Sequence, residues 1–105
     1  MVAMEYREDA ETTERLELRA LERMIAALCD HIDRVTCEAR SRGALCSREA
    51  DFQLQVFEER REQARETIET SANEPYRTRV GRLEHLVEAL DCSRDYFRAF
   101  ELETA

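Results

Sequence analysis

A ladder of apolar residues, spaced alternately three and four positions apart, constrains the fold more than any other feature of this sequence. The spacing averages 3.5 residues, so on an α-helix these side chains form one narrow seam. A helix with such a seam packs lengthwise on another helix, in the same chain or in a partner. The seam consists of Leu18, Leu21, Ile25, Leu28, Ile32, Val35 and Ala39. The pattern predicts a long-helix bundle or a coiled coil.

The composition also predicts an all-α protein with one domain. The chain has 105 residues, enough for a single modest core. Charged residues make up 38% and apolar residues 43%, with only two glycines and one proline to break helices. Ala, Glu, Leu and Arg dominate, as is typical of long helices with solvated outer faces. We expect a flexible lead-in over residues 1–9 and one helical domain over 10–105.

The net charge argues against two classes of partner. The net charge is −8, whereas nucleic acids and anionic membranes bind basic surfaces. We therefore expect neither as a partner. No apolar stretch approaches the roughly 20 residues of a membrane span, and the first residues become polar too early for a signal peptide. We therefore expect an intracellular, cytoplasmic protein whose four cysteines are free thiols.

Two boundaries divide the expected domain into three helices. Gly43 suits the position just after a helix end, and Ser47 suits the N-cap of the next helix. Ser71 and Pro75 mark the second boundary, because proline is tolerated in a first helical turn. The expected helices cover 10–41, 47–70 and 75–102.

The boundary at Gly43 has an alternative, a single helix of some 60 residues with a tolerated glycine, at a cost of ~1 kcal/mol. The ladder fails after Ala39 and resumes out of phase, which favours a turn but also fits a coiled-coil stutter. The shifted ladder is Cys46, Ala50, Leu54, Phe57, Arg61, Ala64 and Ile68. Two architectures remain: three helices running up-down-up, or a long helix folded back as a hairpin.

The seam residues are also the predicted interface. The first helix is aliphatic along its seam, as helical dimer seams are, whereas the aromatic residues cluster in the later helices. We predict a non-enzymatic scaffold that acts through coiled-coil packing, as a homo-oligomer or a subunit of a larger complex. The alternative is an acidic regulatory module or adaptor that engages a basic partner. Near the C-terminus, Tyr96, Phe97 and Phe100 form either core or a patch for a partner.

The candidate chemistry is sparse. Cys29, Asp33 and Cys37 share one helical face, and His85 and Cys92 share another, but no compact metal-binding motif anchors them. A Cys-based metal or redox protein is therefore the least favoured reading, and we expect no metal and no cofactor.

We also expect no enzymatic activity and no catalytic residues. A thin helical bundle leaves little room for a pocket, and the chain has no Gly-rich loop to hold a phosphate. Arg61 is unusual because it lies at a ladder position. It either extends its charged head to water or pairs with a carboxylate of another helix, such as Glu84 or Glu88.

Overall fold

The computed structural model describes residues 2–101 and places the side chains of residues 11–101. Three α-helices and two short 3-10 helices make up this part of the chain, which contains no strand. They are α1 (Val2–Ser41), α2 (Arg48–Thr70), η1 (Ser71–Asn73), α3 (Tyr76–Phe97) and η2 (Arg98–Phe100). The all-α prediction is confirmed, and of the two architectures left open the chain has the three-helix one.

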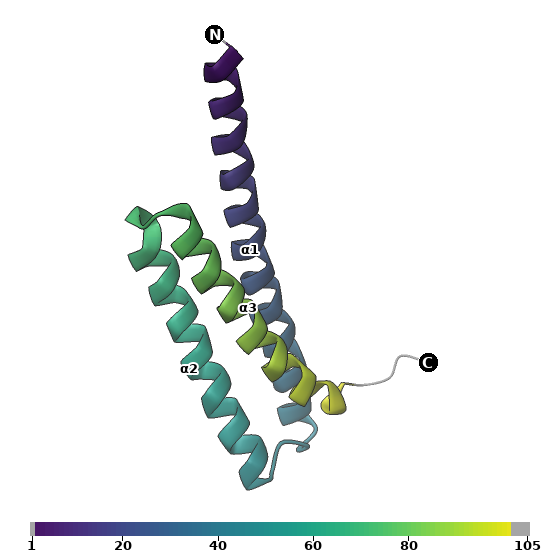
Figure 1. Cartoon of the computed structure of the whole chain (residues 1–105). Helices are drawn as coiled ribbons and strands as arrows, with labels where there is room; N and C mark the ends of the chain where they lie inside the picture. Colours follow the sequence, from purple (N-terminus) through teal and green to yellow (C-terminus); the bar gives the residue numbers. More distant parts are fainter. Residues whose placement is uncertain (1, 102–105) are drawn as a thin grey trace.

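Helix α3 lies at the centre of the bundle. Most of the contacts that α1 and α2 make with other helices are with α3, whereas α1 and α2 touch each other little. Figure 1 shows that α1 and α3 run in the same direction and that α2 runs opposite to both. One buried apolar cluster includes residues from all three helices, so they share a single core.

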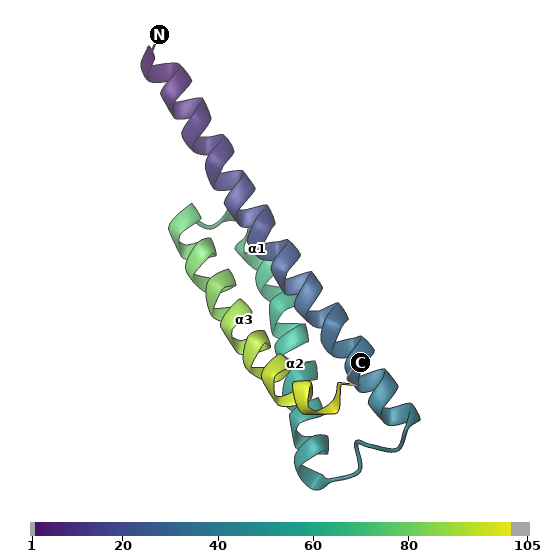
Figure 2. The same ribbon diagram turned by 90° about the vertical axis from the view of Figure 1, so that its right-hand side faces the viewer.

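Helix α1 is much longer than its neighbours, and its first part projects beyond the α2–α3 turn (Figures 1 and 2). It begins at Val2, within the segment expected to be a flexible lead-in. The projection makes the molecule elongated, with extents of 63 × 32 × 16 Å. Its radius of gyration is 17.6 Å, against ~13 Å for a compact domain of this length. The start of α1 therefore lies outside the body of the bundle.

The chain turns at Gly43, as predicted. Gly43 has a φ of 71°, and the N–H of Ala44 donates to the carbonyl of Ala39 at 2.9 Å, which closes the end of α1. Ser47 then caps α2, because its hydroxyl accepts a hydrogen bond of 3.0 Å from the N–H of Ala50. The phase change between the two ladders is thus a turn and not a stutter.

The two glycines are expected to respond oppositely to alanine. Gly43→Ala forces a side chain into the left-handed region and is expected to cost ~1 kcal/mol. Gly81 lies inside α3 with no atom within 4 Å of an added Cβ, so Gly81→Ala is expected to stabilise the protein by ~0.5–1 kcal/mol. Urea unfolding of both variants measures the difference, and a shift in the same direction for both would contradict this account.

The buried residues follow the two ladders. In α1 the seam faces the core, with Ile32 and Ala39 fully buried. In α2 the shifted ladder supplies Phe57, which is 1% exposed, between smaller buried residues. In α3, Leu83 and Leu90 are fully buried. Each helix therefore contributes one lengthwise stripe, the arrangement that the 3.5-residue spacing predicts.

Arg61 links α2 to α1, and the predicted partners were wrong. Its guanidinium pairs with Asp33 and lies 4.6 Å from the ring centroid of Phe57. Glu84 and Glu88 are exposed on α3 and make no ion pair with Arg61. The ion pair therefore links two helices that otherwise touch each other little.

Arg60 makes a second polar link, between α2 and α3. Its Nη1 donates to the carbonyl of Ala89 at 2.8 Å and to the hydroxyl of Ser93 at 2.7 Å. Ser93 is fully buried at a position where the stripe of α3 would otherwise hold an apolar residue. This bond satisfies the buried hydroxyl and restricts how α2 can slide on α3.

Candidate protein-interaction surface

The predicted interface lies inside the single chain. Of the seven seam residues, all but Leu21 are buried, and Leu21 is half-buried against the same core. A second copy cannot reach these side chains while the bundle is closed. In the closed chain the seam holds α1 on α3, so its use in assembly stays a prediction, and any partner contact of the closed bundle needs another face.

The C-terminal aromatic residues also pack within the chain. Phe97 is 1% exposed, and its ring centroid lies 5.0 Å from that of Tyr96 and 6.3 Å from that of Phe100. The carbonyl of Phe100 accepts a hydrogen bond of 2.6 Å from Arg42, which ties η2 to the end of α1. Tyr96 and Phe100 keep some exposed surface, and their role as a partner patch stays a prediction.

A second apolar face lies on α1, turned away from the core. Leu16 is 61% exposed and Met24 is 49% exposed, two of the most exposed large apolar side chains among the described residues. Ala20 and Ala27 are exposed between and beyond them. Steps of four, four and three residues place all four on one side of a helix. We call Leu16, Ala20, Met24 and Ala27 the outer face of α1.

The outer face continues into a groove between α1 and α3, with a volume of about 550 Å³. Met24, Ala27 and Leu28 contribute its apolar wall on α1, and Val87 contributes the wall on α3. Polar and charged groups form its rim, namely His31, Arg34, Asp91 and Arg94. An apolar floor with a polar rim is the usual make-up of a protein-contact surface.

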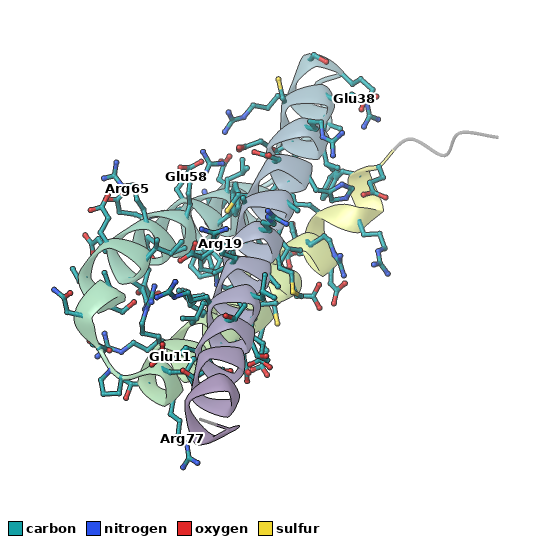
Figure 3. The ribbon with its side chains drawn as sticks, turned by 90° about the horizontal axis from the view of Figure 1, so that it is seen from above. Glu11, Arg19, Glu38, Glu58, Arg65 and Arg77 are labelled. Carbon is teal, nitrogen blue, oxygen red and sulfur yellow. The ribbon has the colours of Figure 1, made fainter. Side chains whose placement is uncertain are left out.

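The charges around the outer face are unbalanced. Glu17 accepts a hydrogen bond from α3, and Glu22 pairs with Arg79 of α3 at 3.5 Å. Arg19 and Arg23 are exposed, and neither has an ion-pair partner among residues 11–101. Figure 3 labels Arg19 in the first half of α1. The carboxylates are thus engaged inside the molecule, whereas the basic groups beside the outer face are available.

A second groove, of about 470 Å³, lies between α2 and α3 around Gly81. Its lining includes the side chains of Arg77, Arg82 and His85. Arg82 already pairs with Glu74 at 3.0 Å, so part of its charge is neutralised. No large apolar side chain is exposed there, which makes this groove a weaker candidate for a protein contact.

The two rows of Cys, Asp and His residues considered as metal ligands do not converge among the described side chains. Within the part of the chain whose side chains are described, no group of three or more His, Cys, Asp or Glu residues is placed to hold a metal ion. All four cysteines are free thiols there. Cys29 is half-buried, whereas Cys37, Cys46 and Cys92 are exposed.

We expect Cys29 to be the slowest of the four thiols to alkylate. Burial raises the pKa of Cys29 above its usual value and outweighs the opposite effect of nearby Arg61. At pH 8 less of this thiol is therefore in the reactive thiolate form. Iodoacetamide labelling followed by peptide mass spectrometry measures the four rates, and labelling of Cys29 as fast as Cys37 would contradict the expectation.

The raised pKa of Cys29 also determines the direction in which the stability of the fold changes with pH. The thiol of Cys29 ionises more readily in the unfolded chain than in the folded one. Its contribution to the free energy of unfolding is therefore complete below the unfolded pKa and declines as the pH rises through the folded pKa. Cys29→Ser is expected to remove this alkaline loss of stability.

The sequence reading missed the outer face, although a signal for it was present. The four outer-face residues have helical spacing, but two are alanines and the stripe is shorter than the seam. The longer aliphatic seam explained helix packing by itself, so the pattern offered no reason to assign a contact to the weaker stripe beside it.

Neither membrane topology nor similarity to known proteins adds to these features. None of the helices that the structure describes combines the length and the apolarity that crossing a bilayer demands. No protein-family model, curated protein or solved structure matches this chain.

Proposed function

We propose that this protein is a non-enzymatic helical scaffold that self-associates through the outer face of α1. The exposed apolar stripe from Leu16 to Ala27, on the side of α1 that the bundle leaves uncovered, is the observation that carries the proposal. Exposed Leu and Met side chains gain free energy when a second surface covers them, at ~25 cal/mol per Å² of apolar area. A partner helix is the natural cover for a straight stripe of this kind.

The projection of α1 supports the same proposal. Its first part extends beyond the α2–α3 turn (Figure 2), where no other helix among residues 2–101 runs beside it. Helical segments without tertiary packing are only marginally stable in water, because most helical stability in proteins comes from burial of one face. Packing against another protein would stabilise this projection.

The proposal keeps the scaffold function predicted from the sequence but moves the contact to a different face of α1, next to the groove with α3. Residues with an exposed fraction of 0–9%, as along most of the seam, offer no surface to a partner. The outer face and the seam lie on different sides of one helix, so α1 is able to hold the bundle together and bind outward simultaneously.

The first test is the mass in solution. Light scattering on a size-exclusion column, at several concentrations and with reductant, is expected to show a dimer or larger species. The mass of the single chain is 12.3 kDa, and a value of 12.3 kDa across the whole concentration range would overturn the proposal.

The second test changes the outer face directly. The double variant Leu16→Glu with Met24→Glu is expected to weaken association by at least about tenfold, because it replaces apolar contacts with charges. Helicity is expected to be retained, since both side chains are exposed. Phe52→Glu on α2 is the matched control, because Phe52 is also 61% exposed, and it is expected to leave association unchanged.

A further inference from the structure

We propose that the groove between α2 and α3 binds a small molecule that carries a phosphate group. None of the residues that line this groove belongs to α1, so the inference is independent of self-association through the outer face. Three observations carry it: the basic groups that line the groove, the open space above Gly81, and the size and composition of the lining.

The groove gathers basic groups in a chain whose net charge is −8. Arg77 and Arg82 line it, and none of its lining residues among the described side chains is acidic. Arg77 has no ion-pair partner among residues 11–101. Arg82 pairs with Glu74 through its Nη1 at 3.0 Å, but a guanidinium has five N–H donors, so others remain for a ligand. An anion in the groove therefore meets two arginines and no carboxylate of the lining.

Polar groups reach the groove from both helices. Arg77, Gly81 and His85 follow one another at steps of four residues, which places them on one side of α3. Gln63 and Thr67 have the same spacing on α2. The side chains of Gln63, Thr67 and His85 all carry hydrogen-bond donors. Phosphate oxygens accept such bonds, and a guanidinium is able to bind a phosphate through two parallel N–H groups.

Gly81 leaves open space in the middle of the row on α3. A Cβ added to Gly81 would meet no atom within 4 Å. A glycine inside a helix destabilises the helix relative to alanine, and no close approach of another helix requires a glycine at this position. The missing side chain instead lets a ligand reach the surface of α3 between Arg77 and His85.

The size and composition of the groove favour a small, hydroxylated phosphate compound. Its volume of about 470 Å³ lies within the range of ~300–1,000 Å³ that is typical of small-molecule sites. Its lining contains no aromatic ring on which a nucleobase would stack. The large exposed apolar side chains of the described residues, Leu16, Met24 and Phe52, all lie elsewhere, so a protein or lipid surface gains little here. The ligand class that fits is a phosphate ester of a small polyol, such as glycerol phosphate.

NMR titration of the backbone amides of the full-length protein tests the site with glycerol phosphate, inorganic phosphate and glycerol. At low ionic strength, glycerol phosphate is expected to cause saturable shifts centred on Thr67, Thr78 and Gly81. Inorganic phosphate is expected to shift the same amides with lower affinity, and glycerol is expected to shift none. Equal affinity for the two phosphates would overturn the assignment of an ester. Shifts that are absent, or spread over the whole chain, would overturn the site itself.

Two variants separate the contribution of charge from that of shape. Arg77→Gln with His85→Gln is expected to weaken binding by about tenfold or more, and both side chains are exposed, so the fold is expected to be retained. Gly81→Leu fills the open space but keeps every basic group, and it is expected to abolish binding although leucine favours the helix. Arg65→Gln is the matched control, because Arg65 is an exposed arginine of α2 outside the groove. Unchanged affinity in either groove variant, or an equal loss in the control, would overturn the proposal.

Discussion

Ile32→Asp is expected to abolish the cooperative folded state. Ile32 is 0% exposed in the middle of the seam, in the cluster that unites α1, α2 and α3. A carboxylate there has no described partner and must either stay charged without water or take up a proton, at a cost of ~4 kcal/mol or more. This is comparable to the whole stability of a small domain, ~5–15 kcal/mol. Circular dichroism during urea unfolding is expected to show loss of the sigmoidal transition.

The control is Cys37→Asp, which introduces the same group at an exposed position of α1. Its expected cost is at most ~1 kcal/mol, from helix propensity and the helix dipole. Retention of a normal transition by Ile32→Asp would show that α1 does not pack on α3 along this seam. The milder Ile32→Ala, with an expected loss of ~2–5 kcal/mol, keeps the test informative if the aspartate variant cannot be purified.

Phe57→Ala is expected to lower the free energy of unfolding by ~3–5 kcal/mol. The ring of Phe57 is 1% exposed, and it also supports the guanidinium of Arg61, which pairs with Asp33. Removal of the ring leaves a cavity and loosens the link between α2 and α1. Urea denaturation followed by circular dichroism measures the change.

Phe52→Ala provides the matched comparison on the same helix, because Phe52 is 61% exposed. Its expected effect lies within about ±0.5 kcal/mol, as for most surface substitutions. Equal losses for the two variants would contradict the assignment of Phe57 to the core and of Phe52 to the surface. The difference between the two values isolates burial from the intrinsic preference of the helix for alanine.

Periodicity predicted which residues are buried but not what covers them. The alternation from Leu18 to Ala39 is equally compatible with a second copy and with α3, because both present a straight apolar stripe. The choice depends on the loops and on the length of each helix. The turn at Gly43 was predictable, since a left-handed glycine and a serine cap are local features.

The periodicity of the sequence could not predict the polar links between helices. Asp33 and Arg61 are separated by 28 positions, and Arg60 and Ser93 by 33. Their meeting depends on the rotation of each helix about its own axis. The projecting start of α1 was also missed. The seam begins only at Leu18, and an acidic segment without a seam resembles a flexible lead-in.

The central place of α3 has a consequence for biogenesis. Residues that meet between the first helix and the C-terminal part of the bundle are far apart in the chain. Glu17 of α1 and Tyr76 of α3 are 59 positions apart, and Arg42, just after α1, and Phe100 of η2 are 58 positions apart. A ribosome adding ~5–20 residues per second therefore releases the seam of α1 roughly 3–12 s before the helix that covers it. During this interval the nascent chain displays an uncovered aliphatic stripe, and closure requires a long loop instead of a local hairpin. The last helix made is the one that completes folding, so a chain whose synthesis stops before residue 76 is expected to leave that stripe uncovered.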